Sequence, residues 1–147
     1  MGATEPWSVY TMEETVIVTA LSGSLISALK VTFWFTGGAH PNTYRETQTL
    51  LLADSGIWQE AANLCTAPVQ LGWDCAEAHV RDLVIADLLE QEAEWVVAGE
   101  VDAAATWLLD RFTLGSNQLT VIFDPYDVGP YVQGAFLVGI PYSELAD

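Results

Sequence analysis

The sequence predicts an α+β domain in which an antiparallel sheet, made of two β-hairpins, packs on one long central helix. Two kinds of pattern support this: β-branched runs flank short glycine-containing turns, and an amphipathic run with helical spacing lies between them. A chain of 147 residues with 51% apolar side chains can build one substantial core. We therefore expect a loose N-terminal segment over residues 1–14 and a single domain over residues 15–147.

The first hairpin is predicted from two β-rich runs. Residues 15–20 (TVIVTA) and 25–35 (LISALKVTFWF) lie on either side of the turn Ser22-Gly23-Ser24. After the interruption at residues 37–42, a strand pattern resumes over residues 43–53. Residues 57–64 are expected to end a strand and pass into a short helical turn.

The central helix is predicted to run from Asp74 or Cys75 to Val97. Asp74 stands three residues before Glu77, which is the capping-box spacing for a helix start. One side of this helix carries apolar residues at helical spacing, namely Val80, Val84, Leu88 and Trp95. The other side carries acidic residues, which we interpret as a solvated face: Asp82, Asp87, Glu90 and Glu94.

A second hairpin is predicted over residues 107–114 and 118–123, and a last strand over residues 135–140. The connection 124–134 between the last two strands contains two prolines and two glycines, so its path is set by the sequence. Four of its side chains are candidate binding residues: Asp124, Tyr126, Asp127 and Tyr131. The alternative is a structural corner whose tyrosines pack at the edge of the core.

The charge balance limits the classes of partner. The chain has 4 basic and 20 acidic side chains, which gives a net charge of −16. Nucleic acid and anionic membranes would be repelled, whereas a basic protein would be attracted. The acidity could instead serve solubility or reflect the habitat. No apolar run reaches the roughly 18 residues of a membrane span, so we expect no membrane insertion of this chain.

Cys65 and Cys75 are the only cysteines, and their spacing indicates a disulfide that closes a short loop. A disulfide would place the domain outside the cytoplasm; two reduced thiols are the alternative. A structural zinc is disfavoured because His79 is the only further ligand nearby. The disulfide loop would display Trp73, a candidate binding residue that could equally pack on the disulfide. The other tryptophans that the helix pattern does not use are Trp7, Trp34 and Trp58.

The sequence contains no motif for covalent catalysis or for a cofactor. It has no G-x-S-x-G elbow, and the pair Gly37-Gly38 is not followed by the Lys-Ser/Thr of a phosphate-binding loop. We expect no cofactor and no metal. His40 is the most suggestive side chain, because it could form a general acid–base couple with Asp124 or Asp127. Its other reading is a histidine that holds the shape of its loop.

Two motifs carry a resemblance to a known family. The run from Leu119 to Leu145 (LTVIFDPYDVGPYVQGAFLVGIPYSEL) resembles the C-terminal signature of the RsiV-like envelope domains, and the segment GGAHPN at residues 37–42 resembles their G-G-A-H segment. The resemblance covers about residues 15 to 146. It implies the outer domain of an anti-sigma factor that binds lysozyme, although related domains also accompany cell-wall deacetylases. The membrane span and the sigma-binding segment of such factors have no counterpart here.

The function that we expect is therefore a non-enzymatic, extracytoplasmic binding or sensor domain, whose partner is a basic protein such as lysozyme or a cell-wall component. The alternative is a cell-wall-associated hydrolase or accessory enzyme that uses His40 with nearby carboxylates. Sequence reasoning alone leaves both hypotheses open.

Overall fold

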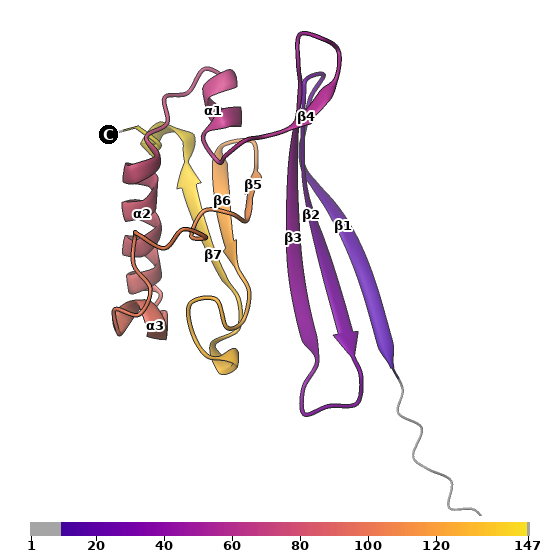
Figure 1. Cartoon of the computed structure of the whole chain (residues 1–147), viewed down its shortest axis with the longest axis vertical. Coiled ribbons are helices and arrows are strands. Elements are labelled where there is room, and N and C mark those ends of the chain that lie inside the picture. Colours follow the sequence, from indigo (N-terminus) through magenta and orange to yellow (C-terminus); the bar gives the residue numbers. More distant parts are fainter. Residues whose placement is uncertain (1–9, 147) are drawn as a thin grey trace, which may run out of the picture.

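The computed structural model describes residues 10–146, and they form two antiparallel sheets and three α-helices (Figure 1). Sheet A contains β1 (Thr11–Leu21), β2 (Leu25–Phe35), β3 (Asn42–Leu52) and β4 (Trp58–Glu60), in that order. Sheet B contains β5 (Phe112–Leu114), β6 (Gln118–Phe123) and β7 (Phe136–Pro141). The α+β class is confirmed, but the predicted single sheet is wrong, because the two hairpins belong to different sheets.

Sheet A is a meander of three long strands and one short one. β1 and β2 pair in antiparallel register around the turn at Gly23, with a bulge between Val18 and Ala20, as the predicted first hairpin requires. β1 begins at Thr11, so residues 11–14 pair with β2, although they belong to the segment predicted to be loose. Residues 1–9 of that segment lie outside the described residues.

Sheet B meets sheet A through the edge of β5. The backbone N–H of Leu114 donates to Ser27 Oγ at 2.9 Å, and that of Phe112 donates to Thr47 Oγ1 at 3.2 Å. These side chains of sheet A replace the backbone partners that an edge strand lacks. The predicted strand over 107–114 shortens to its last three residues, since residues 107–111 form turns.

The predicted long helix is not confirmed. The helices are α1 (Thr66–Gln70), α2 (Glu77–Glu90) and α3 (Glu94–Val97). The helix is interrupted between α2 and α3. Glu92 lies there with a φ of 59°, a left-handed conformation that cannot continue a helix. Asp74 is not the cap: the N-cap of α2 is Ala76, which has no capping side chain, and its N–H donates to the carbonyl of Leu145 at 2.9 Å.

The core lies between α2 and sheet B (Figure 1). Val80, Val84 and Leu88 of α2 are fully buried, as the helical spacing predicts. They share one apolar cluster with buried residues of sheet B, among them Leu114, Leu119, Val121, Phe123 and Val138. Sheet A contributes only its inner face near the turn, through Leu25 and Leu51. Its opposite face is open to solvent.

Candidate binding surfaces

The two motifs of the sequence analysis meet in space. The loop at residues 37–42 joins β2 to β3, and the loop at residues 124–134 joins β6 to β7. The ring of His40 stacks on that of Tyr131, with centroids 3.7 Å apart and an angle of 20° between the rings. The hydroxyl of Tyr131 donates to the carbonyl of Pro41 at 2.8 Å. The contact therefore closes the far end of sheet A onto sheet B.

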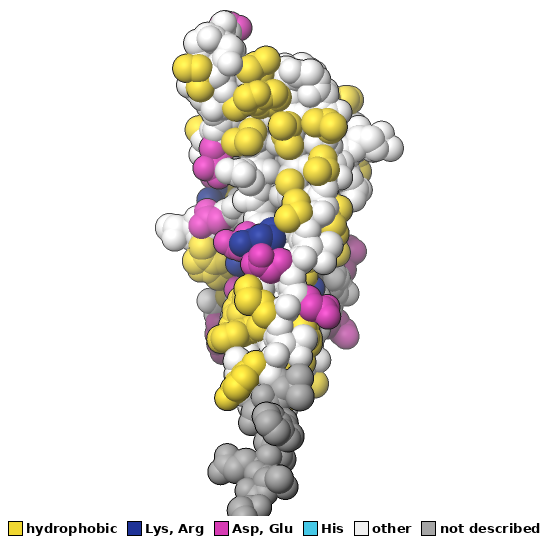
Figure 2. Space-filling model, turned by 90° about the vertical axis from the view of Figure 1, so that its right-hand side faces the viewer, with side chains coloured by type: hydrophobic (Ala, Val, Ile, Leu, Met, Phe, Trp, Pro, Cys, Tyr) yellow, Lys and Arg dark blue, Asp and Glu magenta, His cyan; other side chains and the backbone are white. Residues whose placement is uncertain are grey.

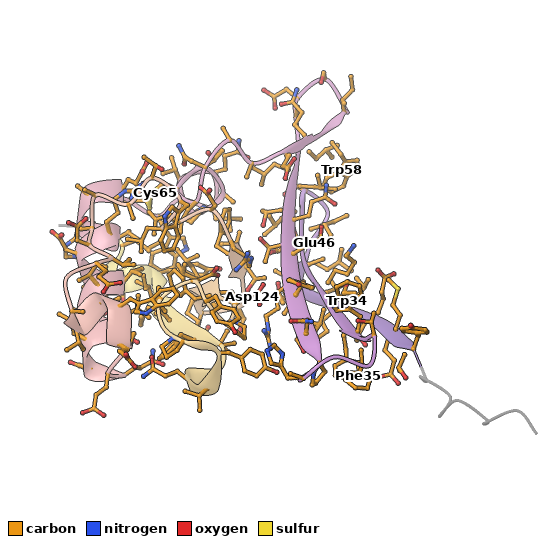
Figure 3. All side chains as sticks on the ribbon, turned by 60° about the horizontal axis from the view of Figure 1, so that its bottom comes forward. Trp34, Phe35, Glu46, Trp58, Cys65 and Asp124 are labelled. Carbon is orange, nitrogen blue, oxygen red and sulfur yellow. A yellow bond between two sulfur atoms is a disulfide. The ribbon has the colours of Figure 1, made fainter. Side chains whose placement is uncertain are left out.

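An ion-pair cluster lies beside this contact. Asp124 is buried and accepts hydrogen bonds from the backbone N–H of Arg45 at 3.0 Å and from the guanidinium of Arg45 at 2.9 Å. Arg111 lies 3.5 Å from Asp124 and donates to Asp127 at 2.8 Å. Figure 3 places Asp124 in the space between the two sheets. The cluster ties the start of the loop to β3.

The structure therefore contradicts two expectations for this loop. Asp124 was predicted to be a binding residue, but the residue is only 6% exposed and its charge is balanced by arginine. The acid–base couple of His40 with Asp124 or Asp127 is not formed, because both carboxylates pair with arginines. The Nδ1 atom of His40 lies 3.0 Å from the carbonyl of Pro41 instead. The contacts of His40 are thus with its own loop and with Tyr131.

The rest of the loop is fixed against α3. Gln133 Oε1 accepts the backbone N–H of Glu94 at 3.0 Å, and Val128 accepts the N–H of Trp95 at 3.0 Å. Gly129 leaves room for this arrangement, since a Cβ there would stand 2.1 Å from Gln133 Oε1. Tyr126, at a φ of 74°, projects from the loop with 56% of its surface exposed. It is the candidate of this loop most open to a partner.

The predicted disulfide is confirmed: Cys65 and Cys75 are joined, with their Cα atoms 5.5 Å apart. The loop that they close contains α1. Trp73 lies in this loop with 42% of its surface exposed, and its ring packs against that of Tyr142 at a centroid distance of 5.7 Å. Burial raises the pKa of the Tyr142 hydroxyl, which donates to the carbonyl of Gly115 at 2.6 Å. Trp7 lies outside the described residues.

A polar cleft of about 290 Å³ lies between sheet A and the start of α2. Glu60, Arg81 and Asp110 are among the residues that line it. Arg81 is already engaged, because it pairs with Glu77 at 3.1 Å and donates to the carbonyl of Ala105 at 2.8 Å. Within residues 10–146, no group of three His, Cys, Asp or Glu side chains is placed to hold a metal ion.

The stretch of chain richest in carboxylates includes the predicted solvated face of the helix. The segment 82–110 contains eight carboxylates and no Lys or Arg. It comprises most of α2, all of α3 and the turns that follow. Helices α2 and α3 lie on the side of the molecule opposite sheet A (Figure 1), whereas Asp110 lines the cleft beside sheet A. Exposed carboxylates of the segment are Asp82, Glu90, Glu92, Glu94, Glu100, Asp102 and Asp110. A count of charge along the chain, rather than around one helix, would have found it.

All four Lys and Arg side chains of the protein form ion pairs with carboxylates of the same chain. They form ion pairs, Lys30 with Glu14 and Glu46, Arg45 with Asp124, Arg81 with Glu77, and Arg111 with Asp124 and Asp127. The acidic segment thus has no basic residue of its own to neutralise it. None of the helices in the described part of the chain is long and apolar enough to cross a membrane.

Comparison with known proteins places the fold. No curated protein sequence matches the chain. Two solved structures resemble it at 20% sequence identity: a member of the DUF3298 family from Bacteroides fragilis NCTC 9343 (TM-score 0.58, 95% of this chain and 54% of that one) and a DUF3298 family protein from Pseudomonas aeruginosa PAO1 (TM-score 0.59, 92% and 60%). The chain thus spans little more than half the length of these proteins. Residues 78–143, from α2 to the last turn, match the family described as "Protein of unknown function (DUF3298)".

Proposed function

We propose that this protein is a non-enzymatic, extracytoplasmic binding domain that recognises a basic protein through the acidic segment 82–110. One observation carries the proposal: the continuous segment 82–110 contains eight carboxylates and no Lys or Arg, and all of these carboxylates but Asp87 are exposed. Exposed apolar side chains accompany them, namely Leu89, Val97 and Trp107. Such a surface offers both charge for the encounter and contact area for the complex.

The electrostatics favour attraction of a cationic protein. Unbalanced carboxylates on one side create a field that raises the rate of encounter with a positively charged surface. At physiological salt this field extends only about 8 Å beyond the surface, so the acidic segment itself must form the contact. The internal pairing of every Lys and Arg side chain leaves the protein without a competing basic patch.

The disulfide between Cys65 and Cys75 supports an extracytoplasmic location, since such bonds persist in oxidising compartments. The resemblance of residues 37–42 and 119–145 to the RsiV-like envelope domains supports lysozyme, a strongly basic protein, as the first partner to test. The rival hypothesis of a cell-wall hydrolase has no comparable support, because His40 is stacked on Tyr131 and contacts no carboxylate in the described part of the chain.

Calorimetric titration with lysozyme at about 0.05 M and about 0.3 M NaCl tests the proposal, because screening weakens charge attraction between the two concentrations. The informative variant is Glu90→Gln/Glu94→Gln/Glu100→Gln. Its matched control is Glu13→Gln/Asp54→Asn/Glu60→Gln, which removes three charges from the side of sheet A.

Both triple variants carry a net charge of −13 instead of −16 (−16 + 3). We expect the first to weaken binding about tenfold or more at low salt and the control to weaken it less than about threefold. Equal weakening by both variants would mean that net charge alone acts, and no heat from the wild-type protein at low salt would remove lysozyme as the partner.

A further inference from the structure

The two sheets differ in whether side chains form hydrogen bonds to the backbone groups along their edges. At sheet B, the edge of β5 is covered by Ser27 and Thr47, as described above. On the other edge of that sheet, the side chain of Gln91 donates to the carbonyl of Leu137 in β7 at 3.0 Å. Side chains of neighbouring elements thus satisfy backbone groups that would otherwise be open to another chain.

In sheet A, one edge is covered and the other is not. β3 pairs with β4 over Leu50–Leu52, and further along Asp124 accepts the N–H of Arg45. β1 is the opposite edge strand, and over its eleven residues it pairs only with β2. Among residues 10–146, no backbone or side-chain group bonds to its outer edge. A long strand with a free edge is a template for a further strand.

The side chains of β1 are unusually apolar for such an exposed strand. The exposed fractions are 67% for Met12, 66% for Val16, 46% for Ile17, 55% for Val18 and 73% for Leu21. Figure 2 shows hydrophobic side chains spread over this side of the molecule, with basic and acidic side chains next to one another near its middle. Exposed apolar residues on a free edge are typical of a strand that pairs with another strand.

The charges on β1 are arranged in a way that suits an identical strand. Glu13 and Glu14 are its only charged residues, and none follows in residues 15–21. If two β1 strands pair in antiparallel fashion about an axis at Val16, Glu14 lies opposite Val18 and Glu13 lies opposite Thr19. No carboxylate then faces its counterpart, whereas parallel pairing would set like charges side by side.

The remaining charges permit the approach of a second copy. On the outer face of sheet A, Lys30 lies 2.6 Å from Glu46 and 3.9 Å from Glu14, so the lysine offsets one of the two negative charges of this cluster. The helical part of the acidic segment 82–110, α2 and α3, lies beyond sheet B (Figure 1). Its repulsion toward a copy docked at β1 is damped because charge interactions in physiological salt fade over about 8 Å.

We propose that two copies of the chain associate through antiparallel pairing of their β1 strands about a two-fold axis near Val16. Four strands from each copy then form one continuous sheet. The interface is isologous, so it closes at two copies and leaves no further free edge at β1. The acidic segments of the two copies remain open at opposite ends of the dimer.

Sedimentation velocity over a wide range of protein concentration tests this proposal. We expect a dimer whose affinity increases when the salt is raised from about 0.05 M to about 0.5 M, because screening reduces the repulsion between two chains of net charge −16. Binding of a basic protein would have the opposite salt dependence, so failure of one proposal can be told from failure of the other. A monomer at every concentration and salt would overturn the dimer.

The variant Val16→Glu places two like charges opposite each other at the proposed axis. We expect it to weaken the dimer at least about tenfold. The matched control is Val132→Glu, which adds the same charge at a side chain 88% exposed in the loop after β6 and should leave the dimer unchanged. A dimer that survives Val16→Glu, or that Val132→Glu weakens equally, would contradict pairing at β1.

Hydrogen exchange of the wild-type protein provides a test that needs no variant. Amides of β1 should exchange more slowly at concentrations where the dimer forms than at concentrations where it dissociates. Protection that appears on other strands instead of β1 would place the interface elsewhere and refute the proposed pairing.

Discussion

Replacing Asp124 with asparagine perturbs the contact that joins the two sheets most directly. The buried carboxylate bonds to both the backbone and the guanidinium of Arg45 and lies near Arg111. Loss of one partner of a buried ion pair costs about 3–5 kcal/mol. Water offsets part of this cost, because the side chains of Arg45 and Arg111 are 23% and 31% exposed. We expect Asp124→Asn to lower the free energy of unfolding by about 2–3 kcal/mol.

Urea unfolding, followed by circular dichroism, measures this loss as a lower midpoint with an unchanged slope. In thermal melts it corresponds to a fall of roughly 4–12 °C. The control is Glu77→Gln, which breaks the more exposed pair with Arg81 and should cost about 0.3–0.5 kcal/mol. If Asp124→Asn costs no more than this control, the ion-pair cluster does not hold the sheets together.

Three further perturbations follow from the contacts described above. Reduction of the Cys65–Cys75 disulfide should lower the free energy of unfolding by about 2.7 kcal/mol, as expected for closing a loop of this length, and a urea midpoint unaffected by reductant would contradict this. Tyr131→Phe removes the hydrogen bond between the loops and should cost about 1 kcal/mol, whereas the exposed Tyr126→Phe should cost almost nothing; equal costs would refute the closing role of Tyr131. Because burial raises the pKa of Tyr142, the folded state favours its neutral hydroxyl. The contribution of this group to the free energy of unfolding should be fully present below about pH 10 and be lost as the pH rises through the raised pKa. Tyr142→Phe should reduce this alkaline loss in thermal melts recorded against pH.

Local patterns predicted the strands of this protein well. The β-branched run around residues 15–20 and the turn at Gly23 specify a hairpin by themselves. The observed register, in which Ile17 pairs with Leu29, follows from that turn. The buried stripe of Val80, Val84 and Leu88 was equally readable from helical spacing. Each of these features depends on residues that are close together in the sequence.

The division of the strands into two sheets could not be predicted from local sequence patterns. It depends on Ser27 and Thr47 accepting the N–H groups of β5, and these partners are 87 and 65 residues apart in the chain. The helix break also escaped the pattern, because Trp95 and Val96 fall in register with α2. Only the left-handed Glu92, held where Ala93 bonds back to Leu88, interrupts the helix, and no glycine or proline marks the place.

The candidate site was predicted in part. The two loops with unusual glycine and proline content do meet, through His40 and Tyr131. The role of Asp124 was missed because its partner Arg45 lies 79 residues away. Folding brings together charged residues that are far apart in the sequence. An acidic residue in a loop motif is therefore only weak evidence that its carboxylate is exposed.

In the proposed function, the acidic segment 82–110 forms the contact with a basic protein. Hydrogen exchange of the wild-type protein, with and without saturating lysozyme at low salt, tests this most directly. The claim predicts slower exchange of amides within α2, α3 and the turns up to residue 110, with β1 and β2 unchanged by lysozyme. Protection confined to sheet A, or to the loop at residues 124–134, would contradict it.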